Sequence, residues 1–166
     1  MGTLFDPKFL PGYVKMGLTE KIPVLFPGGH ATLVDKSRPM TPEMRQTARN
    51  IGEQLWNAGL PVLDDLSGDS YGWFPPADKP MTDAELRRFK TDKYIEMLKS
   101  CQPGLTYIIM HCTDVSPFFA QIAHDGATRK GDLLAMTNPA LKAFIEKEGI
   151  ILTTWRELKT RREKAR

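Results

Sequence analysis

Residues 103–111 read PGLTYIIMH, and this stretch decides the predicted fold. Pro103-Gly104 marks a turn, and Leu105 to Met110 is the most apolar run in the chain. A run of this length after a turn is typical of a strand buried on both faces in a parallel sheet. The predicted strand ends directly at His111, so a titratable side chain stands at its carboxyl end.

Three further short runs are predicted as strands, with helices between them. Helix starts are marked by Asp, Thr or Asn, whose side chains cap free amides, and helix ends by Gly. Thr82 with Glu85 and Thr154 with Glu157 each have the spacing of a capping box. The predicted strands are 22–26, 61–63 and 150–152, and the predicted helices open at Asp6, Thr41, Thr82, Asn138 and Thr154. The first four of these helices are expected to end at Gly17, Gly59, Lys99 and Gly149, and loops are expected at 67–80 and before Asn138. His124 is interpreted as a structural residue at the C-terminus of a helix, near a stop at Gly126.

Strands that alternate with helices predict the α/β class, with a parallel sheet covered by flanking helices. The 166 residues suit a single α/β domain, residues 1–166. Four strands are too few to close an eight-stranded barrel. The sequence therefore predicts either an open sheet or half of a barrel.

The composition is that of a folded globular protein, with 41% hydrophobic and 26% charged residues. The net charge of +3 comes largely from the final helix, which we interpret as a solvated basic face and not as a nucleic-acid site. No apolar stretch is long enough to span a bilayer. We expect a cytoplasmic protein with no membrane partner, unless a secretion signal precedes Met1.

His111 is the best candidate for a catalytic residue. Function in parallel sheets concentrates beyond the carboxyl ends of the strands, and imidazole works as an acid or base near neutral pH. A histidine bonded into the sheet edge is the structural alternative. Cys112 is interpreted as a small buried residue, because strand neighbours face apart and a Cys-His contact is poorly supported.

Weaker candidates lie after the other predicted strands. Asp65 of the Asp64-Asp65 pair and His30 are predicted to contact substrate, although a capping role for the aspartate and a plain loop role for the histidine remain alternatives. Trp73, with Tyr71 and Phe74, is predicted to form a wall for a sugar ring. Packing of the long loop is the competing interpretation. The pair Gly28-Gly29 leaves open a small nucleotide-binding fold that handles an anion, without a phosphate fingerprint.

The segment 103–111 resembles the Pro-Gly-Leu/Val-Thr-Glu-x-x-x-His segment of YdjC-like (ChbG-type) carbohydrate deacetylases. Arg129 and Asp132 are similar to the family's Arg-x-x-Asp stretch, and 149–158 to its closing strand and helix. Residues 1–5 resemble the stretch directly after the metal-binding Asp-Ser-His motif in one branch of the family. Two positions differ, since the family has Glu at Tyr107 and Pro at Cys112.

The resemblance implies the C-terminal part of a (β/α) barrel of the glycoside hydrolase/deacetylase type. It implies hydrolysis of the acetamide, a linear amide, of an N-acetylated amino sugar or oligosaccharide by a divalent metal such as Mg or Zn, with His111 as acid. The metal ligands would precede Met1, so we expect none in this chain. Whether the chain is active by itself is left open. The alternative is a non-catalytic half barrel that binds carbohydrate or self-associates as a homo-oligomer.

Overall fold

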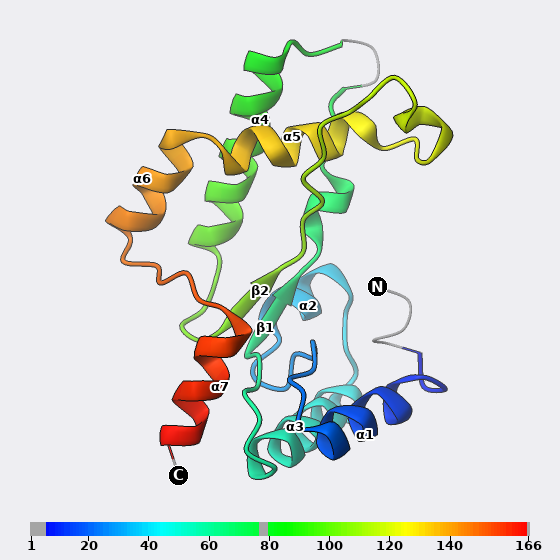
Figure 1. Ribbon diagram of the computed structural model, residues 1–166, viewed down its shortest axis with the longest axis vertical. Helices are drawn as coiled ribbons and strands as arrows, with labels where there is room; N and C mark the ends of the chain where they lie inside the picture. The colour runs from blue at the N-terminus through cyan, green and yellow to red at the C-terminus, as the bar shows by residue number, and fades with distance from the viewer. Residues whose placement is uncertain (1–5, 77–79, 166) are drawn as a thin grey trace. The chain divides into compact units, whose positions relative to one another are not determined.

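The structure, a computed structural model, describes residues 6–76 and 80–165 (Figure 1). The chain forms two units, each with its own helices and its own buried polar groups. The first unit comprises Met1–Ser67, Gln102–Tyr107 and Leu152–Arg166, and the second comprises Gly68–Cys101 and Ile108–Ile151. The family resemblance at residues 1–5 lies outside the described residues.

Helices α1 (Leu10–Glu20) and α3 (Pro42–Asn57) build the first unit's apolar core. The cap predicted for α3 is confirmed, because the Thr41 hydroxyl accepts from the Met44 amide at 3.2 Å. The core consists of Val14, Val24, Phe26, Ala48, Leu55 and Leu60. Its apolar side chains supply the unit's main stabilisation, since burial removes them from water.

The end of α1 differs from the prediction. The helix continues through Gly17 to Glu20, and Lys21 caps it with a positive φ of 54°. A Cβ added at Gly17 would lie 2.3 Å from Cγ1 of Val24. Gly17 therefore allows close approach to the core, and its prediction as a helix stop was wrong.

The sheet is much smaller than predicted. Strands β1 (Asp65–Ser67) and β2 (Thr106–Ile108) form a two-stranded parallel sheet, so the protein is mixed α/β and mostly helical. Residues 22–26 belong to no strand, and within 61–63 only Leu63 pairs, through one parallel bridge to Pro27. Prolines in these runs remove ladder donors.

Residues 150–152 are not a strand either. The Ile150 amide donates to the carbonyl of Ile145 and so finishes the preceding helix, while Ile151 and Leu152 are each 75% exposed. The prediction that the 105–110 run is buried on both faces was also wrong. Tyr107 is 37% exposed and stacks on Trp155 with ring centroids 6.2 Å apart.

Helix α2 (Thr32–Ser37) packs against β1 in the first unit, and α7 (Trp155–Lys164) closes that unit. The capping box predicted at Thr154 and Glu157 is confirmed. The basic face of α7 is partly used for packing. Arg162 lies 3.8 Å from the centroid of the Trp56 ring, a cation–π contact.

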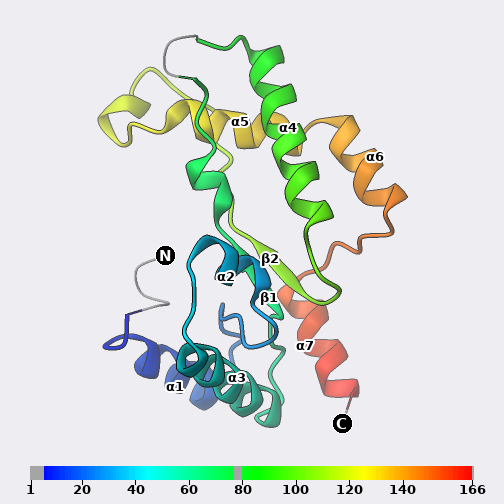
Figure 2. The same ribbon diagram turned by 180° about the vertical axis from the view of Figure 1, so that it is seen from behind.

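Helices α4 (Asp83–Lys99), α5 (Gly126–Met136) and α6 (Pro139–Lys147) form the second unit, with the short helices η2 (Asp69–Gly72) and η3 (Phe119–Gln121). Figures 1 and 2 show α5 crossing α4. The crossing is close, because a Cβ at Gly131 would lie 2.7 Å from Cγ of Lys90. The capping box predicted at Thr82 and the cap at Asn138 are confirmed.

Helix α5 occupies part of the chain predicted as a loop. Asp125 is the residue before its first turn, and Gly126 is its first residue. The interpretation of His124 as the end of a helix that stops at Gly126 was therefore wrong, because a helix begins at this glycine. No helix in the described ranges is both long enough and apolar enough to cross a bilayer.

Candidate functional site

His111 lies three residues after β2, in the second unit, and the protein holds it at two points. Its backbone amide donates to Oδ2 of Asp132 at 3.2 Å. Its Nε2 shares a hydrogen bond with the hydroxyl of Tyr71. The two rings meet edge to face, with centroids 4.9 Å apart. Both the backbone and the ring of this histidine are therefore positioned.

Asp132 is the centre of the network. Its side chain is 2% exposed, and besides the His111 amide it binds two donors from α4. Oδ1 accepts from Nζ of Lys90 at 3.0 Å and from the hydroxyl of Tyr94 at 2.8 Å. A buried carboxylate needs such partners, because burial without them costs several kcal/mol.

Lys90 is fully buried, with 0% exposure. Burial lowers the pKa of its ammonium group, and the hydrogen bond and charge of Asp132 oppose that shift. The ammonium also donates to the Ser70 carbonyl at 3.3 Å and lies 5.6 Å from the Trp73 ring centroid. Burial, and then the Asp132 charge, raise the pKa of the Tyr94 hydroxyl far above its ordinary value.

Ser70 connects the Lys90–Asp132 pair to the segment that contains His111. Its hydroxyl donates to the carbonyl of Ile109 at 2.9 Å, two residues before His111. Its own carbonyl binds Lys90, and the next residue is Tyr71. The contacts thus run in a closed circuit from His111 through Asp132, Lys90 and Ser70 to Tyr71 and back. We call these five residues the His111 network.

A partly exposed ion pair lies nearby, at the start of α5. Nε of Arg129 donates to Oδ1 of Asp125 at 2.8 Å. This bond is the main cause that lowers the pKa of the Asp125 carboxyl, and the charge of His111 adds to it. The same bond raises the pKa of Arg129. His111 therefore stands among groups of both signs.

Cys112 is exposed, so its prediction as a buried residue was wrong. The reason is the shortness of β2, which ends four residues earlier and leaves 112 outside any sheet. Partial desolvation of the thiol, and then the Asp132 charge, raise its pKa. Since the thiolate is the reactive form, the Cys112 thiol is a weak nucleophile here.

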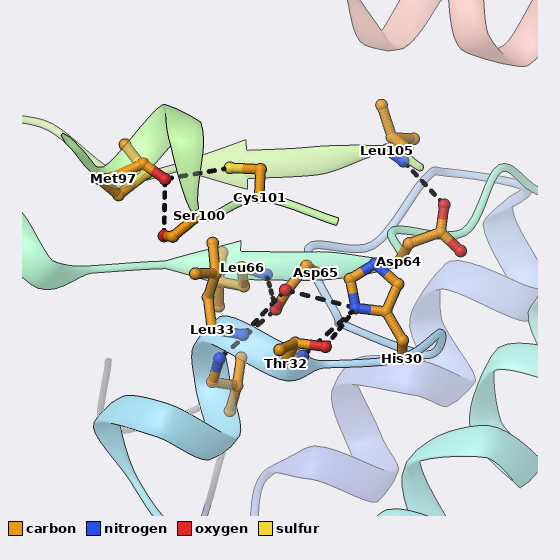
Figure 3. Close-up of polar contacts among 11 residues, drawn as sticks. His30, Thr32, Leu33, Asp64, Asp65, Leu66, Met97, Ser100, Cys101 and Leu105 are labelled. Atoms are coloured by element: carbon orange, nitrogen blue, oxygen red, sulfur yellow. Dashed lines mark hydrogen bonds and ion pairs between the residues drawn. The ribbon is translucent and has the colours of Figure 1, made fainter. Parts of the chain in front are cut away.

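The acid pair of the first unit has a different environment (Figure 3). Asp65 has 0% exposure, and its oxygens accept from the amides of Leu33 at 2.8 Å and Leu66 at 2.8 Å. Asp64 turns to another segment, where Oδ2 accepts from the Leu105 amide at 2.7 Å. The two carboxylates thus bind backbone amides of different segments.

His30 is exposed and points toward Asp65 (Figure 3). Its Nδ1 lies 3.4 Å from Oδ2 of Asp65 and accepts from the Thr32 amide at 3.3 Å. The same nitrogen lies 2.9 Å from the Thr32 hydroxyl, and its contact with Asp65 is an ion pair only in the protonated ring. The preceding glycines allow close packing, since a Cβ at Gly29 would lie 2.5 Å from Cα of Asp64.

Trp73 is half-buried and meets Tyr94 edge to face at 4.9 Å, so much of its ring packs into the second unit. Tyr71 and Phe74 are more exposed than Trp73, at 38% and 59%. The predicted substrate contacts of Asp65, Trp73 and His30 stay predictions. Asp65 and Trp73 each have a packing role in addition.

The Lys90–Asp132 pair was not predicted from the sequence. The available signal was the spacing of Leu86, Lys90, Tyr94 and Met97, which puts a lysine on an otherwise apolar helical face. Such a lysine requires a buried anionic partner. Asp132 entered the sequence prediction only as part of a segment similar to the family, without a role.

The donors needed for a metal site are not gathered in the described ranges. Within residues 6–76 and 80–165, no three His, Cys, Asp or Glu side chains lie so that they could hold a metal ion. We therefore derive no chemical step through a metal.

No protein-family model, curated protein or solved structure in the comparisons matches this chain. The function is consequently inferred from the His111 network.

Proposed function

We propose that this chain carries the acid histidine of a hydrolase of linear amides, His111, and acts on the acetamide of an N-acetylated amino sugar. The observation that carries the proposal is the double fixation of His111, at its amide by Asp132 and at Nε2 by Tyr71. A buried ion pair supports both anchors. Positioning of this kind is what general acid catalysis requires.

The chemistry of amide hydrolysis fits an imidazole. The departing amine needs a proton, and histidine exchanges protons near neutral pH. The exposed rings of Tyr71 and Phe74 offer apolar area for a pyranose face. The resemblance of 103–111 to YdjC-like deacetylases supports the choice of an N-acetylated sugar.

In that family a divalent metal such as Mg or Zn supplies an activated water and polarises the carbonyl. The described residues do not offer a set of three ligands, so we propose that such a metal is held by residues outside those described. We also propose that the chain forms part of a (β/α) barrel. Support comes from the parallel β1–β2 pair, whose connection contains α4.

The test is release of acetate from N-acetylglucosamine oligomers by the full-length gene product that contains this chain, with Mg²⁺ or Zn²⁺ added. We expect His111→Gln to lower the rate by about 10²-fold or more, the usual size of a general acid effect. His124→Gln is the matched control, because His124 is exposed and outside the His111 network. Equal rates for the two variants would contradict the role of His111.

A second candidate is binding of the same sugars without turnover. It is favoured by the exposure of the Tyr71 and Phe74 side chains. Calorimetry with the same oligomers separates the two. Heat of binding without acetate release would favour this candidate, and the absence of both would overturn both.

A further inference from the structure

We propose that Tyr71 is a positioning residue that fixes the tautomer of His111, with the proton on Nδ1, so that Nδ1–H is the donor offered to a ligand. This inference rests on the proposed function for its meaning, since it names which ring nitrogen faces the sugar. Its physical basis is independent of that function and lies in the hydrogen bond between Tyr71 and Nε2.

A neutral imidazole has one nitrogen that donates and one that accepts, and the partner of one nitrogen sets the other. A phenol is a better donor than an imidazole N–H, because phenol ionises near pH 10 and neutral imidazole loses a proton only far above that. The imidazole nitrogen lone pair is also the better acceptor. Tyr71 therefore donates to Nε2, and the ring proton remains on Nδ1.

The protein holds the phenol where this bond forms. Tyr71 comes directly after Ser70, whose carbonyl binds Lys90 at 3.3 Å and whose hydroxyl binds the Ile109 carbonyl at 2.9 Å. Asp132 fixes the His111 amide at 3.2 Å and also binds Lys90. Both partners of the bond are thus attached to the same buried ion pair.

The other ring nitrogen is available. In the part of the chain that the structure describes, Nδ1 of His111 has no hydrogen-bond partner, and the ring is only half-buried. In the neutral ring, Nδ1–H suits an acceptor such as the carbonyl oxygen of an acetamide. Proton transfer to the departing amine uses the doubly protonated ring, in which Nε2–H donates to the Tyr71 hydroxyl. Arg129 and Asp125 pair with each other.

The experiment measures the ring nitrogens of His111 directly, by long-range ¹H–¹⁵N correlation on the ¹⁵N-labelled chain at a pH where the ring is neutral. We expect Nδ1 to show the signal of a protonated nitrogen and Nε2 that of an unprotonated one. In Tyr71→Phe we expect the Nε2–H form, which imidazole prefers in water, to become the majority.

Tyr107→Phe is the matched control, because it also removes a tyrosine hydroxyl. Tyr107 is similarly exposed, at 37%, and its ring stacks on Trp155 and not on His111. The control should leave the His111 tautomer unchanged. A wild-type ring protonated at Nε2, or an unchanged tautomer in Tyr71→Phe, would overturn the inference. The wild-type spectrum decides the first point without any variant.

The measurement needs no substrate, so its result is separate from that of the acetate assay. The predicted tautomer without acetate release or binding would count against the proposed function alone. Acetate release that depends on His111, with the proton on Nε2, would overturn only the role of Tyr71.

Discussion

Asp65 and Asp132 are both buried carboxylates, one in each unit, and they are stabilised in different ways. Asp65 accepts mainly from backbone amides, including those of Leu33 and Leu66. Asp132 accepts from a lysine ammonium, a phenol and a single backbone amide. The first arrangement fixes β1 to the backbone of the first turn of α2, and the second joins three separate segments around a histidine.

The difference shows which acidic residue carries information about function. Backbone amides are neutral donors that every chain contains, so Asp65 is explained by the shape of its own unit. A buried Lys–Asp pair costs desolvation energy that packed apolar side chains avoid. Its presence next to His111 fits a positioning role in the second unit.

The largest expected effect comes from removing the cation of the pair. Lys90→Met leaves Asp132 buried without its ammonium, and we expect the free energy of unfolding to fall by about 3–5 kcal/mol. Urea unfolding measures the change. Lys93→Met on the same helix is the control, because Lys93 is 41% exposed and pairs with Glu96 in an exposed bridge.

Equal stability of the two lysine variants would show that the buried pair adds nothing over an exposed one. The contrast between Asp65 and Asp132 would then lose its energetic basis.

A smaller effect is expected in the first unit. Asp65→Asn keeps the size of the side chain but turns an amide NH₂ toward backbone N–H groups, and we expect a loss of about 1.5–3 kcal/mol. Asp92→Asn, on an exposed position of α4, is the control and should change stability little. Unfolding in urea again provides the measurement, and a neutral Asp65→Asn would refute the capping role.

The smallest effect concerns the partly exposed pair near His111. Arg129 lowers the pKa of Asp125 below its ordinary value of 3.8, so the unfolded chain binds more protons between the two values. The stabilisation is present above the ordinary value and is lost as the pH falls through the folded pKa. We expect Asp125→Asn to make the melting temperature fall less steeply as the pH is lowered from 6 to 2, the acid limb of the stability curve.

Asp114→Asn removes an equal charge from an exposed loop position and should leave the acid limb as it is. If both variants gave the wild-type slope, the Asp125–Arg129 bond would contribute nothing in solution.

Four of the five predicted helix starts are confirmed, because caps are local, but the start predicted at Asp6 was wrong, since α1 begins at Leu10 after Phe9. Thr41, Thr82, Asn138 and Thr154 each accept the amide that the pattern assigned to them. Helix α5 was missed, since Gly126 was interpreted as the stop of a preceding helix by the same local rules. Its Arg129–Asp125 spacing of four residues was the signal that favoured a helix.

Strands were poorly predicted because a strand needs a partner from elsewhere in the chain. The Leu25 amide, in a predicted strand, donates to the Tyr13 hydroxyl at 2.8 Å and not to a neighbouring strand. No local pattern encodes that choice.

The position of His111 as a candidate came from the sequence, but its partners did not. Tyr71 is 40 residues away from it, and Lys90 is 42 residues from Asp132. Contacts over such separations depend on the crossing of α4 and α5, which the sequence pattern did not define. Tyr71 was predicted only as part of a sugar-binding wall.

The proposed function requires that a sugar ligand meets the second unit at His111. The sharpest test is an NMR titration of the chain with an N-acetylglucosamine oligomer, followed through the ring signals of its three histidines. We predict that the His111 signals shift and saturate while those of the exposed His124 stay in place. Binding that leaves the His111 signals unmoved, or no binding at all, would contradict the proposal.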